Sequence, residues 1–144
     1  MSRYWNLIAA IMVVGGLWAW ASPGFAHGGQ NAAAQSALAE SEMTSCAVSN
    51  RGQALIDCVG TALSSLSAGI DKFDVKKEAP QLISLAAQAG EIRSKPKAEA
   101  LRVLNRVLAV TRSLATKSAT DMVPAYNAVA GAFSRAISVI ERKG

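Results

Sequence analysis

In a chain of 144 residues, the clearest helical pattern is in RGQALIDCVGTALSSLSAGIDKF, residues 51–73. Its apolar residues recur at intervals of three and four, the spacing that places side chains on one face of an α-helix. The members of this face are Leu55, Val59, Ala62, Leu66, Ile70 and Phe73. Asp57 falls on the opposite face. The pattern predicts an amphipathic helix from about Arg51 to Gly69, with Asn50 as its N-cap.

The two cysteines of the chain, Cys46 and Cys58, flank a turn sequence, Ser49-Asn50-Arg51-Gly52. A short helix from about Glu40 to Val48 would place Cys46 in its last turn and Cys58 in the second turn of the next helix. Small exported domains commonly join such a pair, so the spacing predicts a disulfide between two helices. A zinc site and a redox pair are the alternatives. Zinc requires three or four ligands, and the usual redox motif separates its cysteines by two residues.

The N-terminal segment favours export. Arg3 precedes an uncharged, mostly apolar run at residues 7–21, and Ser22-Pro23-Gly24-Phe25-Ala26 supplies a helix breaker followed by small residues. This pattern is typical of a secretory signal peptide over residues 1–26, cut after Ala26, and predicts a periplasmic or secreted protein without a stable membrane span. The alternative is an uncleaved anchor. The run spans about 22 Å as a helix, however, and the hydrocarbon core of a bilayer is about 30 Å thick.

The remaining chain is predicted to be all-α. Residues 27–39 carry one large apolar side chain, Leu38, and are expected to form a flexible lead-in. Residues 40–144 are expected to form a single domain, with further helices at about Pro80–Arg93, Pro96–Lys117 and Thr120–Arg142. The resulting fold prediction is an antiparallel four-helix bundle, with a short N-terminal helix clipped to it by the disulfide.

Residues for common catalytic chemistry are scarce. His27 is the only histidine, which argues against a Ser-His-Asp or Cys-His nucleophile system. The same residue could bind copper weakly at a terminus freed by cleavage, but a copper brace needs a second histidine. Asp71 and Asp74, like Glu40 and Glu42, are expected to be solvated. The sequence therefore predicts no catalytic residue, no metal site and no cofactor. An enzyme that uses carboxylate or lysine chemistry remains an alternative class.

Cations gather around the predicted fourth helix. Seven of them lie between Glu91 and Lys117, where Glu91 and Glu99 are the anions; they are Arg93, Lys95, Lys97, Arg102, Arg106, Arg112 and Lys117. At about 100° per residue, Lys95, Arg102, Arg106 and Lys117 line up opposite the apolar arc of the helix. These four residues are predicted to contact an anionic partner. An ordinary solvated face is the alternative. Nucleic acid is not expected, because few aromatic residues are available to stack on bases.

These features lead to a functional hypothesis. The chain is expected to be a small exported helical protein without enzymatic activity. It would act through surface contacts as an envelope accessory, adaptor or binding factor, with a protein or an anionic envelope component as its partner. One alternative is a periplasmic stress chaperone of the holdase type. A second is a protein that binds an anionic envelope polymer or lipid through the basic helix face.

Overall fold

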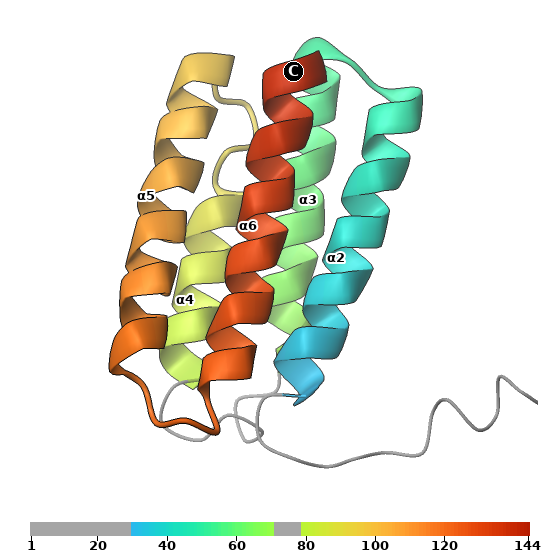
Figure 1. Ribbon diagram of the computed structural model, residues 1–144. Helices are drawn as coiled ribbons and strands as arrows, with labels where there is room; N and C mark the ends of the chain where they lie inside the picture. The colour runs from blue at the N-terminus through green and yellow to red at the C-terminus, as the bar shows by residue number, and fades with distance from the viewer. Residues whose placement is uncertain (1–29, 71–78) are drawn as a thin grey trace, which may run out of the picture.

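The computed structural model describes residues 30–70 and 79–144, and the described residues are helical, without a strand (Figure 1). The helices are α2 (Gln30–Ser49), α3 (Gly52–Gly69), α4 (Ala79–Gly90), α5 (Lys97–Lys117) and α6 (Val123–Lys143). The predicted leader, His27 and Phe73 lie outside the described residues. Among the described helices, none is both long and apolar enough to cross a bilayer.

The five helices pack side by side. The connection between α2 and α3 lies at the same end of the group as the C-terminus, and the connection between α5 and α6 lies at the other end (Figure 1). The closest pairs are α5 with α6, α2 with α6, α3 with α4 and α2 with α3, whereas α4 and α5 contact each other less. The helices therefore form a ring in which α4 and α5 have the weakest contact of any neighbouring pair. We call the interface between α4 and α5 the seam.

The first described helix is longer than the sequence indicated. Residues 30–39 are helical and belong to α2, so the prediction of a flexible lead-in is wrong for them, as is the prediction of a short helix at 40–48. One face of α2 is buried, and its members recur every three or four residues: Ala32, Ser36, Ala39, Met43 and Cys46. Small side chains let α2 pack closely against α3 and α6. Packing between helices stabilises this segment although it has few large apolar residues.

Ser36, a member of that buried face, makes an unfavourable contribution to folding. The hydroxyl oxygen of Ser36 is buried and has no hydrogen-bond partner within residues 30–70 and 79–144. An unsatisfied buried hydroxyl opposes folding, because the water that it loses is not replaced. The burial of α2 thus rests on its alanines, Met43 and Cys46 rather than on polar contacts at Ser36.

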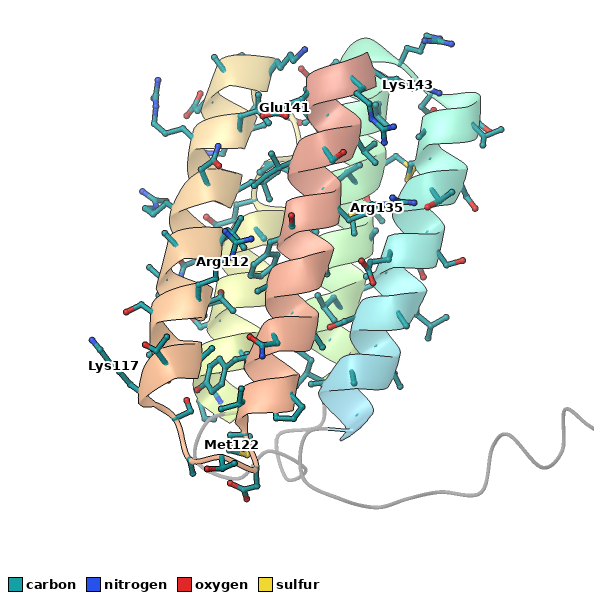
Figure 2. The ribbon with its side chains drawn as sticks, viewed as in Figure 1. Arg112, Lys117, Met122, Arg135, Glu141 and Lys143 are labelled. Atoms are coloured by element: carbon teal, nitrogen blue, oxygen red, sulfur yellow. A yellow bond between two sulfur atoms is a disulfide. The ribbon has the colours of Figure 1, made fainter. Side chains whose placement is uncertain are left out.

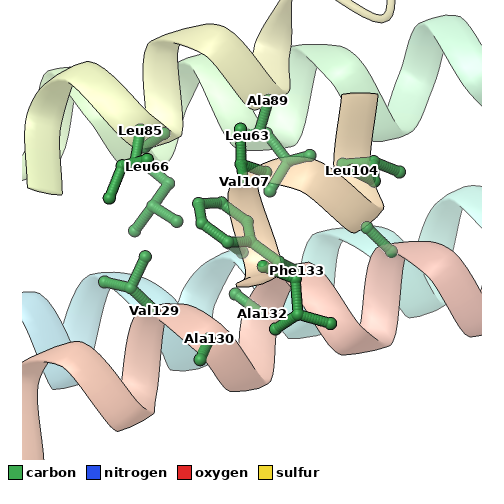
Figure 3. Packing of buried hydrophobic residues seen from close by; sticks show 14 of the residues in the cluster. Leu63, Leu66, Leu85, Ala89, Leu104, Val107, Val129, Ala130, Ala132 and Phe133 are labelled. Atoms are coloured by element: carbon green, nitrogen blue, oxygen red, sulfur yellow. The ribbon is translucent and has the colours of Figure 1, made fainter. Parts of the chain in front are cut away.

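The core lies between the helices and is continuous from α2 to α6. Its largest fully buried side chains include Tyr126 and Phe133, both from α6. The ring of Phe133 points from α6 towards side chains of α3, α4 and α5, among them Leu63, Leu66 and Val107 (Figure 3). Phe133 is therefore the side chain on which four of the helices converge.

α3 and α4 approach each other closely at two glycines, where a larger residue would require neighbouring atoms to shift. A Cβ built on Gly60 would lie 3.2 Å from the carbonyl oxygen of Gly90, and a Cβ on Gly90 would lie 3.2 Å from that of Gly60. The Ser67 hydroxyl also donates to the Ile83 carbonyl at 2.9 Å. These contacts hold α4 against α3 in its first half and at its C-terminal end.

The turn between α2 and α3 differs from the predicted cap. Arg51, and not Asn50, is the N-cap residue of α3, and its side chain makes no capping bond. Asn50 instead donates from its backbone and its side-chain amide to the Cys46 carbonyl, at 2.9 and 3.2 Å, and so closes the end of α2. The chain then enters α3 through Gly52, whose φ of 62° lies in the left-handed region that glycine tolerates.

Candidate functional site

The predicted cations all lie at the surface on or just before α5, but they do not form one set. Arg102, Arg106 and Lys117 are exposed and lie within about 60° of one another around the helix. Lys95 precedes α5 and pairs with Glu99 at 3.7 Å. Three of the four predicted residues therefore form what we call the α5 basic face: Arg102, Arg106 and Lys117.

The basic face has no internal partners. Within residues 30–70 and 79–144, Arg102, Arg106 and Lys117 make no hydrogen bond or ion pair with another residue. Arg112 is likewise exposed and unpaired, but it lies on the side of α5 that faces α6 (Figure 2). The charges of Arg102, Arg106 and Lys117 are therefore available to a partner in solvent.

Some cations elsewhere in the described structure connect helices instead. From α6, Arg135 donates to the Thr44 hydroxyl at 3.0 Å, and Lys143 donates to the Ala47 carbonyl at 3.2 Å; both bonds hold α2 (Figure 2). At the start of α5, Lys97 donates to the Glu141 carbonyl at 3.1 Å. Arg135, Lys143 and Lys97 therefore have a structural role that the cations of the α5 basic face lack.

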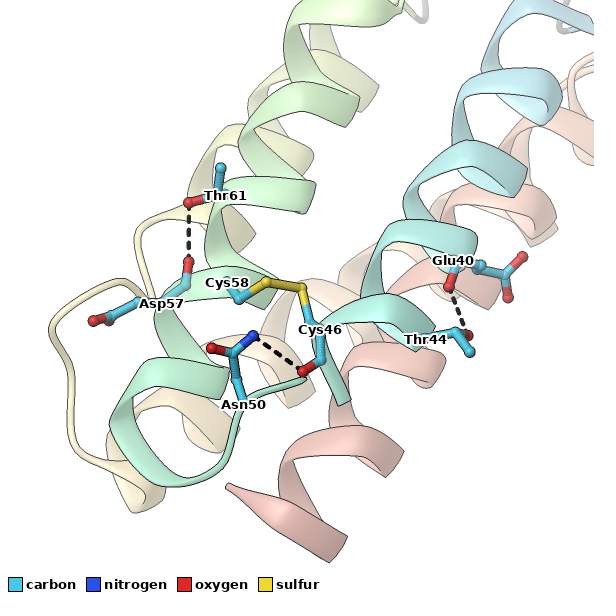
Figure 4. The surroundings of a disulfide bond; sticks show 7 residues. All are labelled: Glu40, Thr44, Cys46, Asn50, Asp57, Cys58 and Thr61. Atoms are coloured by element: carbon cyan, nitrogen blue, oxygen red, sulfur yellow. Dashed lines mark hydrogen bonds between the residues drawn. A yellow bond between two sulfur atoms is a disulfide. The ribbon is translucent and has the colours of Figure 1, made fainter. Parts of the chain in front are cut away.

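The disulfide predicted from the sequence is present. Cys46 of α2 and Cys58 of α3 are joined, with a Cα–Cα distance of 5.8 Å (Figure 4). It lies at one side of an open groove of about 460 Å³ whose other lining residues are almost all uncharged: Ser41, Glu42, Ser45, Ser49, Asn50, Thr61 and Ala62. The groove carries hydroxyl groups but no cation, so it does not extend the basic face.

A second groove was not predicted. It has a volume of about 430 Å³ and lies along the loose seam between α4 and α5, where its lining includes Leu85, Val110 and Leu114. By its spacing Val110 belongs to the apolar arc of α5, but 43% of Val110 is exposed. Helical periodicity identifies the face to which an apolar residue belongs. It does not show whether a neighbouring helix covers that residue.

Asp57, which faces away from the core of α3 as predicted, stabilises the connection between α4 and α5. Its carboxylate accepts a hydrogen bond from the Ser94 backbone N–H at 2.7 Å and another from the Gln53 amide at 3.1 Å. Ser94 has a left-handed φ of 67°, an unusual conformation that this bond supports. The Ser94 bond first and then the Gln53 bond hold the pKa of Asp57 below its ordinary value; desolvation opposes them, and the charge of Arg93 adds the smallest lowering effect.

We expect Asp57→Asn to reduce the dependence of stability on acid pH. Because the folded-state pKa of Asp57 is lowered, its contribution is present above the pKa of the unfolded chain and is lost as pH falls through the folded-state value. The free energy of unfolding of the wild type should therefore fall more steeply than that of the variant between about pH 5 and about pH 2. Urea denaturation at a series of pH values measures both slopes. Parallel slopes would contradict the assignment.

The described residues contain no group of three or more His, Cys, Asp or Glu side chains that could hold a metal ion. Comparison of the chain with models of protein families, with curated proteins and with solved structures finds no match.

Proposed function

We propose that this chain is an exported, non-enzymatic helical protein that binds an anionic component of the cell envelope through the α5 basic face. The observation that carries the proposal is the contrast among its cations. Arg135 and Lys143 of α6 bind a hydroxyl and a backbone oxygen of α2, whereas Arg102, Arg106 and Lys117 have no partner among the described residues. Charges that the fold does not use are the ones that a partner can neutralise.

The remaining parts of the proposal rest on the sequence. The leader at residues 1–26 supports export, and the disulfide is consistent with an oxidising compartment. The near absence of histidine supports a role in binding rather than in catalysis. We include in the proposal an antiparallel four-helix arrangement of α3, α4, α5 and α6, along which α2 packs.

Charge reversal tests the proposal. Arg102→Glu/Arg106→Glu should lower the affinity for vesicles rich in anionic lipid by about thirtyfold or more, because each Lys or Arg near an anionic surface contributes about 1 kcal/mol. Retention of the wild type on an anionic polymer matrix should also fall as salt rises. Sedimentation with vesicles and salt elution measure the two effects. Both variant side chains are exposed, so helicity by circular dichroism should not change.

A matched control separates the α5 basic face from net charge. Arg51→Glu/Arg142→Glu changes the total charge by the same amount at two exposed positions outside α5. It should retain most of the binding. Equal losses in the two double variants would count against a specific face, and wild-type retention that does not respond to salt would count against the function itself.

The other two hypotheses predict different outcomes. An adaptor for one protein partner would recover that partner from an envelope extract while ignoring vesicles and polymer. A holdase would suppress aggregation of an unrelated client on heating or at acid pH. Among the described residues, the large apolar side chains that are exposed are Leu38, Val48 and Val110, and they lie on two different helices. So few exposed apolar side chains favour the electrostatic contact over the chaperone.

A further inference from the structure

The seam between α4 and α5 is open for a structural reason. α4 is held close to α3 by the crossing of Gly60 and Gly90 and by the bond from Ser67 to Ile83. α5 packs mainly against α6. Because α4 packs against α3 and α5 packs against α6, α4 and α5 do not pack closely against each other. A groove of about 430 Å³ remains between them. That volume falls in the range of sites for small ligands.

The groove has an apolar strip formed by Leu85, Val110 and Leu114, and its α4 edge is uncharged. Leu85 is almost fully buried, Leu114 is half-buried, and Val110 is 43% exposed. The α4 edge is formed by Pro80, Gln81, Ser84 and Gln88. The hydroxyl of Tyr126 donates to the side-chain oxygen of Gln81 at 3.1 Å, which leaves the amide NH₂ of Gln81 as a donor at this edge. An apolar chain that entered the groove would remove Val110 and Leu114 from water.

Two unpaired cations flank this apolar surface. Arg106 is four residues before Val110, and Lys117 is three residues after Leu114, spacings that place side chains next to each other on one side of a helix. Both belong to the α5 basic face. A ligand that combines an apolar chain with one anionic end could therefore place its chain in the groove and pair its anionic end with one of these cations.

We propose that the groove between α4 and α5 binds a single-chain anionic amphiphile, its acyl chain against Leu85, Val110 and Leu114 and its anionic head group at Arg106 or Lys117. This inference rests on the proposed function and names the class of anion. A polymer would use the cations but not the groove. A partner helix would need about 800 Å² of surface on each side, far more apolar area than Val110 and Leu114 expose.

Titration of ¹⁵N-labelled protein with dodecanoate below its micelle concentration tests the inference. Amide resonances of residues 80–88 and 106–117 should shift. Acetate, which has the head group alone, and dodecanol, which has the chain alone, should bind at least tenfold more weakly. Dodecyl phosphate should bind as dodecanoate does if the site recognises negative charge in general; a preference for either one identifies the head group.

Variants locate the ligand within the groove. Val110→Asn should weaken dodecanoate binding at least tenfold, and Arg106→Glu/Lys117→Glu should abolish it. Val48→Asn is the matched control, because Val48 is 82% exposed and lies on α2 away from the groove. It should leave affinity unchanged. Equal effects of the two asparagine variants, or equal binding of dodecanol, would overturn the inference.

The failure of this inference differs from the failure of the proposed function. Salt-sensitive binding to anionic vesicles or polymer without any shift on addition of dodecanoate would refute the groove site and leave the α5 basic face intact. Absence of both would refute both proposals. Stronger shifts of the same resonances by an acidic amphipathic peptide than by dodecanoate would overturn the amphiphile in favour of a partner helix.

Discussion

Replacing Cys46 and Cys58 together with serine is expected to lower the free energy of unfolding by about 3 kcal/mol. The disulfide joins residues 12 apart in the sequence, and the closed loop restricts the unfolded chain. It also joins α2 to α3 at a turn where the described hydrogen bonds of Asn50 close α2 but do not reach α3. Urea denaturation of the oxidised wild type and of the double variant measures the difference.

The fold itself should survive this change. α2 also contacts α6 along its length and is bound there through Arg135 and Lys143. Circular dichroism should therefore show the helicity of the wild type at low temperature. Wild type treated with a reductant is the control and should unfold at the urea concentration of the double variant. Equal midpoints for the oxidised wild type and the variant would show that the disulfide does not stabilise the protein.

Phe133→Ala is expected to have the largest effect, a loss of about 3 to 5 kcal/mol in the free energy of unfolding. Phe133 is 0% exposed, and its ring fills the space where α3, α4 and α5 face α6 (Figure 3). Removal of the ring loses the favourable free energy of transferring it from water to the core. It also leaves a cavity, because four packed helices cannot all move inward. Thermal and urea denaturation measure the loss.

Graded replacements show whether cavity size is the cause. Phe133→Leu keeps most of the apolar volume and should lose markedly less than Phe133→Ala. Val48→Ala, at an exposed position of α2, should change stability by less than about 0.5 kcal/mol. A loss for Phe133→Ala no larger than that for Val48→Ala would mean that Phe133 does not occupy the centre of the core.

Local patterns predicted the helices that carry many large apolar side chains. The periodicity of α3, α5 and α6 and the turn between the cysteines located these helices to within a few residues, and the disulfide between α2 and α3 is confirmed. The pattern failed for α2 because alanine and serine give little contrast between two faces. Their burial becomes evident only when α3 and α6 lie beside them.

Some features of the candidate site could likewise be predicted from the sequence, and others could not. The order of residues was enough to place Arg102, Arg106 and Lys117 on one face of a helix, because a residue's direction around an α-helix depends only on its position along the chain. Three features became known only from the packed helices: the pairing of Lys95 with Glu99, the bond from the Ser94 N–H to Asp57, and the groove between α4 and α5. Each of these depends on distances between segments that local periodicity does not specify, since packing against other helices sets them.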